Sequence, residues 1–211
     1  MTITDIKPQV KNPKRYSVFI DGDFAFGIDG TELLYQRLEV GQTLHQSTYE
    51  KLLHQLEYTS ARDTAVRYLS RNMRSVQQVR DKLTEKEFST INIEKVIGLL
   101  SQRGYLNDIA FATAFISQKT KLNNFGRWRI EQELRAKGVG QKSIDAAYSQ
   151  TFADDEDGEC QGIAAARRAL AKKLRNKDTS QIANDPKEIN RLKMFLSRRG
   201  FDFDTIDFCL S

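Results

Sequence analysis

The sequence predicts a mainly α-helical protein: a tandem array of three three-helix repeats, preceded by a small N-terminal domain with a β-hairpin. Two observations support this prediction. An Asp-Gly pair separates two apolar runs near the start of the chain, and one spacing of apolar residues then recurs three times. Only three prolines and twelve glycines interrupt the 211 residues, so long helices can form.

The hairpin is predicted at residues 15–28, after an irregular start at residues 1–13. Asp21-Gly22 lies between two apolar runs, and this pair is typical of a two-residue hairpin turn because both positions require a positive φ. Such a turn pairs Phe19 with Phe24 and Ser17 with Phe26. It places two apolar sets on opposite faces: Phe19, Phe24, Phe26 and Ile28 on one, and Tyr16, Val18, Ile20 and Ala25 on the other.

Because both faces of the hairpin are apolar, it needs cover from further strands or a helix. A helix over residues 31–40, ended by Gly41, is expected to provide this cover. From residue 48 onward the pattern is helical. A capping box at Ser75-Val-Gln-Gln78 predicts one helix start, because its side chains accept hydrogen bonds from free N–H groups there. Asp185-Pro186 predicts another, since Asp can accept such a bond and proline has no N–H that would be left free. Three glycines after basic last turns predict helix ends: Gly104, Gly138 and Gly200.

One apolar spacing occurs three times in the helical part. Its members are Val79, Leu83, Phe88, Ile93 and Ile97 in the first copy, Ile130, Leu134, Val139, Ile144 and Tyr148 in the second, and Leu192, Leu196, Phe201, Ile206 and Leu210 in the third. A further apolar helix precedes each copy, at residues 65–69, 111–116 and 164–174. The unit is therefore three helices. Each unit is too small to bury its apolar faces alone, so the units should stack in a line.

This organisation divides the chain into an N-terminal domain at 1–60 and repeats at 61–107, 108–152 and 153–211. A cation recurs near each second-helix end, at Lys86, Lys137 and Arg199. It can offset the helix dipole there or contact a partner, and we favour the first role. An acidic residue recurs in the expected first turn of each third helix, where the same dipole argument applies: Glu94, Asp145 and Asp207.

The net charge of +5 is unevenly distributed. Residues 1–60 carry 6 basic and 8 acidic side chains, whereas residues 61–150 carry 16 basic and 9 acidic ones, a net charge of +7. This asymmetry fits a polyanionic partner such as nucleic acid, or simply a solvated helical surface. Charge and helix geometry nominate these contact residues: Arg71, Arg74, Trp128, Arg129, Arg135, Lys172, Lys173 and Arg198.

Trp128 is the only tryptophan. At about 100° per residue it falls opposite the buried stripe of Ile130 and Leu134. The matching residues of the other copies, Gln77 and Asn190, are polar. Trp128 is therefore either an exposed anchor for a protein or a base, or a side chain that packs on a neighbouring repeat or on the N-terminal domain.

Several function classes find no support. No apolar run approaches the roughly 20 residues of a membrane span, and the first residues lack a secretory signal. Two cysteines without a CxxC pattern favour a reducing cytoplasm. His45 and His54 stand apart from other metal ligands, and the acidic run at 154–159 fails the EF-hand pattern. No phosphate-binding loop or nucleophile motif is present. We therefore expect no enzyme activity, cofactor or metal.

Several motifs together resemble the RecX family, the bacterial regulators of the RecA recombinase. They are Arg74-Ser75 with 79–83, 104–108 with Phe111-Ala112, Gly126 with 130–134 and Lys137-Gly138, and 196–201. Asn107 stands where the family more often has Asp, and Glu87 stands where the other two copies have Gly. The resemblance implies tandem three-helix repeats that bind the RecA–DNA filament and mostly inhibit its ATPase, strand exchange and growth, in recombination, DNA repair and the SOS response.

A tandem helical DNA-binding protein that regulates transcription is the alternative. The third helices speak against it, because they carry Glu94, Asp145 and Asp207 where a base-reading helix should expose Arg, Asn or Gln. We expect a monomer whose binding to free DNA is weak, sequence-tolerant and salt-dependent.

Overall fold

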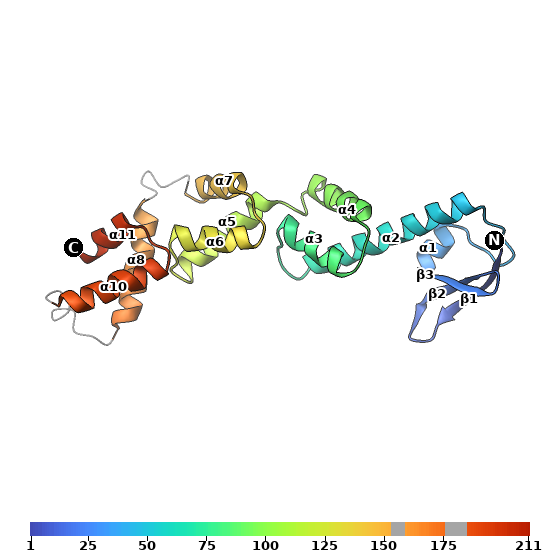
Figure 1. Ribbon diagram of the computed structural model, residues 1–211, viewed down its shortest axis with the longest axis horizontal. Helices are drawn as coiled ribbons and strands as arrows, with labels where there is room; N and C mark the ends of the chain where they lie inside the picture. Colours follow the sequence, from blue (N-terminus) through green and yellow to red (C-terminus); the bar gives the residue numbers. More distant parts are fainter. Residues whose placement is uncertain (153–158, 176–184) are drawn as a thin grey trace.

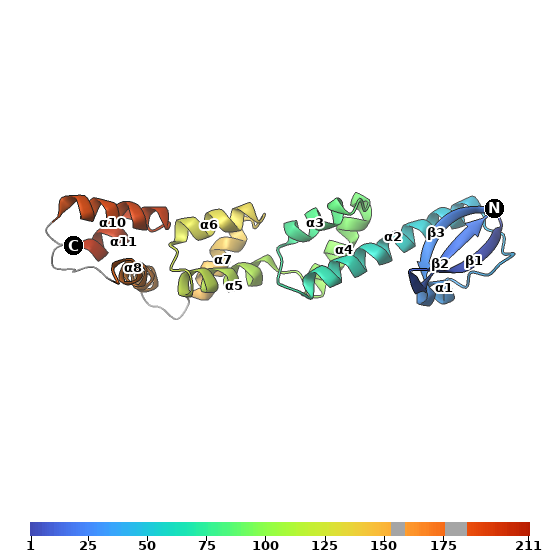
Figure 2. The same cartoon turned by 90° about the horizontal axis from the view of Figure 1, so that it is seen from below.

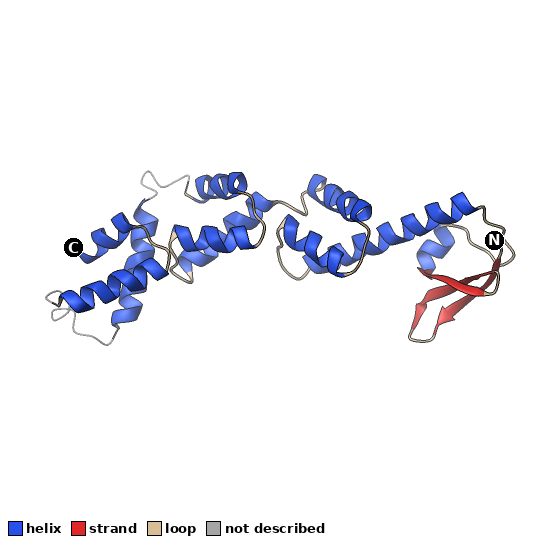
Figure 3. Ribbon diagram, in the orientation of Figure 1, coloured by secondary structure: helices blue, strands red, loops and turns tan. Residues whose placement is uncertain are grey.

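The computed structural model describes residues 1–152, 159–175 and 185–211, the side chains of residues 159 and 160 aside. Its elements form an elongated row, with the N-terminal sheet at one end and the last helices at the other (Figure 1). The described strands are confined to the N-terminal end, and all later elements are helical (Figure 3). The mainly α-helical repeat architecture is thus confirmed. The acidic run at 154–159, for which the EF-hand pattern was considered, has its side chains outside the described part of the chain.

The N-terminal domain is a three-stranded antiparallel sheet in the order β1-β2-β3. Its strands are β1 (Ile3–Gln9), β2 (Asn12–Ile20) and β3 (Asp23–Asp29). Asp21 and Gly22 both have positive φ, of 51° and 95°, which confirms the predicted turn. The irregular start was a wrong prediction. Pro8 lies in β1, which is an edge strand, where a residue without an N–H is tolerated.

A bulge between Val18 and Phe19 changes the predicted register of the hairpin. Phe19 does pair with Phe24, but beyond the bulge Val18 pairs with Phe26 and Ser17 with Gly27. The predicted faces are therefore wrong, because the extra residue moves later side chains to the opposite face. The buried face of the hairpin consists of Val18, Ile20, Phe26 and Ile28, while Phe24 is 60% exposed.

The predicted helix at 31–40 is shorter, as α1 (Gly30–Tyr35). Arg37 has φ 51°, and the following segment returns to the sheet, where the N–H of Gly41 donates to the carbonyl of Ile3 at 2.8 Å. Gly41 therefore does not end the helix. The pairing with the start of β1 holds this segment extended, which local sequence could not indicate.

The long helix α2 (Gln46–Leu69) belongs to both the sheet domain and the first repeat. Its first half packs Leu52 against the sheet, and its second half places Ala61 and Ala65 in the core of repeat 1. The Glu57 carboxylate accepts the N–H of Ser89 at 2.5 Å and the amide of buried Asn92 at 2.8 Å. Burial raises the pKa of Glu57, but these hydrogen bonds outweigh it and the pKa is lowered.

The proposed division at residue 60 cuts through α2, so the position of a truncation matters. A chain starting at 54 keeps Glu57 and the His54 carbonyl, both of which bind the Asn92 amide. A chain starting at 61 loses them and leaves that buried amide unpaired. We expect the shorter chain to be less stable by about 1–3 kcal/mol, the cost of such a group. Urea denaturation of both chains measures this difference, and equal midpoints would contradict it.

Each repeat has three helices and its own apolar core. Repeat 1 uses the end of α2 with α3 (Val76–Glu85) and α4 (Thr90–Gln102); repeat 2 uses α5 (Asp108–Lys121), α6 (Arg127–Ala136) and α7 (Gln141–Thr151); repeat 3 uses α8 (Glu159–Leu174), α10 (Pro186–Arg198) and α11 (Phe203–Leu210). The predicted capping box at Ser75 and the cap at Asp185 are both present. Among the described helices, none is both long and apolar enough to cross a membrane.

The second helix of each repeat ends in the same Schellman motif. In the first copy the N–H of Glu87 donates to Thr84 and that of Phe88 to Leu83; in the others Gly138 and Gly200 take the place of Glu87. All three residues have positive φ: 60°, 76° and 85°. The motif also buries an apolar residue after the turn against the helix, which explains why the spacing recurs.

Glu87 is the one non-glycine residue at these three turns, so Glu87→Gly should stabilise the protein. A side chain in the left-handed region costs about 1–2 kcal/mol, which the greater backbone freedom of unfolded glycine partly offsets. We expect a net gain of about 0.5–1 kcal/mol in the free energy of unfolding, measured by urea denaturation. Glu85→Gly, in the last turn of α3, is the control and should lower the free energy of unfolding. A less stable Glu87→Gly protein would refute this account.

Candidate partner-binding surface

The second helices α3, α6 and α10 lie along one side of the array, one after another (Figure 2). The C-terminal turn of α6 meets the first turn of α3, and the C-terminal turn of α10 meets the first turn of α6. Because free carbonyls at a helix end face free N–H groups at a helix start, neighbouring repeats can provide the backbone hydrogen bonds that these groups lack within their own helices. This end-to-end contact sets the spacing of the repeats.

The junction of repeats 2 and 3 is made of backbone. The N–H groups of Gly126 and Trp128 donate to the carbonyls of Arg199 and Gly200, at 2.8 and 3.1 Å. A Cβ on Gly126 would lie 2.2 Å from the Gly200 oxygen, and one on Gly200 would lie 2.4 Å from the Arg129 nitrogen. Both glycines are therefore required for the two chains to approach this closely.

The junction of repeats 1 and 2 uses the same positions with one difference. At the position of Gly126 stands Ser75, whose hydroxyl donates to the Lys137 carbonyl at 2.5 Å. Gly138 lies so close to Gln77 that a Cβ would be 2.2 Å from its Cβ. The N–H of Val76 donates to the Asp108 carboxylate at 2.9 Å. A side chain thus bridges this junction where direct backbone contact bridges the other.

Trp128 lies at the outer face of the array, next to the second junction. Its backbone is held by Gly200, whereas its side chain is 63% exposed. The packing interpretation is therefore wrong for this chain: neither a neighbouring repeat nor the N-terminal domain buries the indole. Large exposed aromatic side chains of this kind are common at the centres of protein interfaces.

Three of the candidate cations are held by contacts within the chain. The guanidinium of Arg129 lies 3.9 Å from the centre of the Phe125 ring and contacts Glu133 at 3.4 Å. Arg135 pairs with Glu131 at 3.0 Å and with the Gln141 amide oxygen at 2.7 Å. Lys173 lies over the Phe195 ring. These side chains contribute to the packing of the repeats as well as to surface charge.

Four other candidate cations make no hydrogen bond or ion pair with the described part of the chain: Arg71, Arg74, Lys172 and Arg198. Arg74 is nevertheless fixed in place, since its guanidinium stacks on the Tyr68 ring at 4.4 Å. Its Nε is buried without a partner. The structure thus brings an ordered arginine and an exposed tryptophan to successive junctions of the array.

The recurring cation acts structurally in the third copy. Arg199 donates to the carbonyl of Asn123 at 2.8 Å, and so ties repeat 3 to the end of α5. Burial, followed by the charge of Arg129, lowers the pKa of Arg199. Lys86 and Lys137 are the corresponding C-cap residues of α3 and α6.

The recurring acid lies one turn later than expected, in the second turn of each third helix. It pairs with a cation of the second helix: Arg80 with Glu94 at 2.8 Å, and Lys193 with Asp207 at 2.6 Å. In repeat 2 the matching cation is replaced by Glu131, and Asp145 lies 3.7 Å from Arg127 instead. Each acid therefore links the third helix of its repeat to the second, a role that the helix-dipole argument did not predict.

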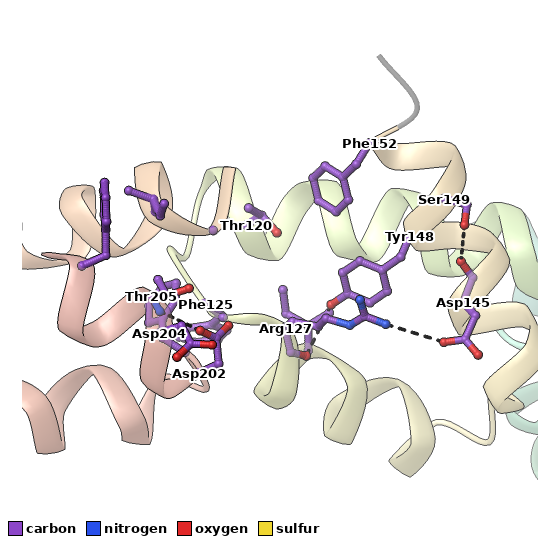
Figure 4. Close-up of a pocket in the computed structure, with 16 residues that line it drawn as sticks. Thr120, Phe125, Arg127, Asp145, Tyr148, Ser149, Phe152, Asp202, Asp204 and Thr205 are labelled. Carbon is purple, nitrogen blue, oxygen red and sulfur yellow. Dashed lines mark hydrogen bonds and ion pairs between the residues drawn. The ribbon is translucent and has the colours of Figure 1, made fainter. Parts of the chain in front are cut away.

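A cleft of ≈790 Å³ separates repeats 2 and 3 (Figure 4). Asp145, Tyr148 and Phe152 of α7 line one wall, and Asp204 and Thr205 of α11 line the other. Burial, followed by the charge of Glu131, raises the pKa of Tyr148. Its hydroxyl therefore stays protonated at neutral pH and donates to the Arg127 carbonyl at 3.3 Å.

The described residues contain no group of three potential ligands that could hold a metal ion.

The comparisons with known proteins cover all parts of this arrangement. Four RecX family models match: the N-terminal domain at residues 1–45, and the first, second and third three-helix domains at 61–100, 107–147 and 159–210. Proteins named "Regulatory protein RecX" from Bacillus pumilus and Bacillus subtilis are each 33% identical, over 97% of this chain and 74% of theirs.

A relative of the same name from Caldanaerobacter subterraneus is 29% identical over 100% of this chain and 99% of its own. A crystal structure titled as regulatory protein RecX has the same fold, with a TM-score of 0.68 and 23% identity over 99% of this chain and 98% of that one. The three successive three-helix domains, the N-terminal sheet and these relatives agree, and the chain belongs to the RecX family of regulatory proteins.

Proposed function

We propose that the protein binds the RecA recombinase filament on DNA and inhibits its ATP hydrolysis, strand exchange and growth. The observation that supports this most is the row of second helices. At 1.5 Å per residue α3, α6 and α10 together extend over about 50 Å. A row of that length suits a partner that repeats along an axis, since one molecule can contact several subunits.

The charge distribution supports the same partner. Residues 61–150 are strongly basic, and a filament carrying DNA presents a polyanion beside protein surface. Arg71, Arg74, Lys172 and Arg198, whose side chains form no ion pair with the described residues, supply charge, and Trp128 supplies apolar area. In this proposal the protein acts in the cytoplasm without catalytic chemistry of its own, and the ATP is hydrolysed by the recombinase.

ATP hydrolysis by the recombinase on single-stranded DNA tests this proposal directly. Preformed filaments are titrated with the protein, and we expect inhibition at well below one molecule per recombinase subunit, because each molecule spans several of them. A protein that is heat-denatured before addition is the control for non-specific effects. Unchanged hydrolysis at equimolar amounts, with filaments verified by electron microscopy, would exclude the proposed activity.

A further inference from the structure

The cleft between repeats 2 and 3 differs chemically from the surface around it. Five aromatic side chains line it: Phe125, Tyr148, Phe152, Phe201 and Phe208. Three exposed carboxylates, of Asp145, Asp202 and Asp204, also line it, against a single cation, Arg127. These carboxylates repel a polyanion, so the cleft is poorly suited to the nucleic-acid contact that the basic surface favours.

The repeat pattern alone does not account for the residues that line the cleft. At the matching positions of the preceding repeat unit, the aromatic residues are replaced by Arg74 for Phe125, Ile97 for Tyr148, Ser101 for Phe152, Val139 for Phe201 and Ala146 for Phe208. Lys142 stands in α7 where Asp204 stands in α11. The fold therefore forms without these aromatic residues and without an acid at the position of Asp204, and their gathering at one junction needs a separate explanation.

Arg127 shows what kind of group the cleft binds. Its guanidinium lies 4.5 Å from the centre of the Tyr148 ring and 3.7 Å from the Asp145 carboxylate. A hydrogen bond with Glu131, opposed by burial, raises its pKa. An aromatic face beside a carboxylate is a favourable site for Lys or Arg, through cation–π and ionic attraction together. The opposite wall offers the same pair of groups, Phe208 and Asp204, as Figure 4 shows for the acid, and Arg167 already lies 5.5 Å from the centre of the Phe208 ring.

The Asp204 carboxylate is available for such a contact. Asp202 already accepts the N–H of Thr205 at 2.7 Å, and Asp145 accepts the Gln141 amide at 2.9 Å. Asp204 has no hydrogen bond or ion pair within the described residues and is exposed. Among the three lining carboxylates, Asp204 is thus the one without a partner among the described residues.

We propose that this cleft is a docking site for a protein segment in which a Lys or Arg side chain is flanked by aromatic or aliphatic ones. The cation pairs with Asp204, and the apolar neighbours cover the rings of Phe152 and Phe208. The charge of the cleft identifies the occupant as protein, whereas the basic exterior suits nucleic acid. The proposal is independent of the recombinase activity, because neither filament nor DNA enters into it.

A fluorescein-labelled peptide, acetyl-Phe-Arg-Leu-Arg-Phe-amide extended by a labelled lysine, tests the proposal with the full-length protein. We expect saturable binding by fluorescence anisotropy. Asp204→Lys, which places at this position the residue that repeat 2 already carries, should weaken binding roughly tenfold, the loss of one ion pair in a partly desolvated site. Phe208→Ala should weaken it similarly.

Asp23→Lys, on the exposed N-terminal hairpin, is the matched charge control and should bind as the unmodified protein does. Circular dichroism melts verify that each variant is folded. A peptide with Glu in place of both Arg residues should not bind. Equal binding of both peptides, unchanged binding by Asp204→Lys, or displacement of the peptide by oligothymidine would each overturn the proposal. The last outcome would instead assign the cleft to nucleic acid.

Discussion

Gly126→Val is expected to separate repeats 2 and 3. The new Cβ would lie 2.2–2.4 Å from the Gly200 and Phe201 backbone, which cannot move aside as a flexible side chain could. Overpacking of this kind costs about 1–3 kcal/mol, and the two backbone hydrogen bonds across the junction add roughly 1 kcal/mol each. We expect a loss of about 3 kcal/mol and a thermal transition that splits in two, because adjacent repeats are stabilised by their shared interface.

Two variants control this prediction. Gly126→Ser introduces the residue that repeat 1 has at the same position, and its hydroxyl can bind a carbonyl as Ser75 does, so it should cost less than valine. Gly98→Ala lies inside α4 with no atom within 4 Å of the new Cβ, and it should stabilise the protein by about 1 kcal/mol. A Gly126→Val protein that melts in one unchanged transition would contradict the role assigned to this junction.

The helical repeats could be predicted because their signals are local. Ser75 and Asp185 start helices with their own side chains, and a Schellman motif fixes a leucine, a glycine and an apolar residue at set distances. The N-terminal domain was harder because its structure depends on distant pairing. The first strand is held by β2, and the residues around Gly41 are held by Ile3. A one-residue bulge, which leaves Ala25 without a partner opposite Val18 and Phe19, was enough to place Phe26 on the same face as Val18.

The candidate surface was predicted in part. Periodicity alone placed Trp128 on the outer face of α6, and the structure agrees. It could not distinguish cations without a partner among the described residues, such as Arg198, from those bound within the chain, such as Arg135, because the partners come from other turns and helices. The aromatic cleft was missed entirely. Comparing the repeats position by position could have indicated it, since Phe125 and Arg74 occupy equivalent places.

Trp128→Ala is expected to reduce inhibition of the recombinase filament while leaving the protein folded. The indole is 63% exposed, and alanine keeps the N–H that binds Gly200, so the unfolding free energy should change by less than about 0.5 kcal/mol. An aromatic anchor at the centre of an interface contributes about 2 kcal/mol or more. The concentration for half-inhibition of ATP hydrolysis should therefore rise roughly 30-fold, since each 1.4 kcal/mol is tenfold.

Intrinsic fluorescence provides a second measurement, because Trp128 is the only indole in the chain. The free protein should emit at long wavelength, as an indole in water does, and filament should shift or quench this emission. Tyr35→Ala is the matched control: that side chain is also an exposed aromatic, at 78%, but lies at the end of α1 in the N-terminal domain. Because it lies outside the proposed contact surface, its loss should leave inhibition unchanged. If Trp128→Ala inhibits as well as the unmodified protein, and filament leaves the emission unaltered, the filament contacts another face of the array.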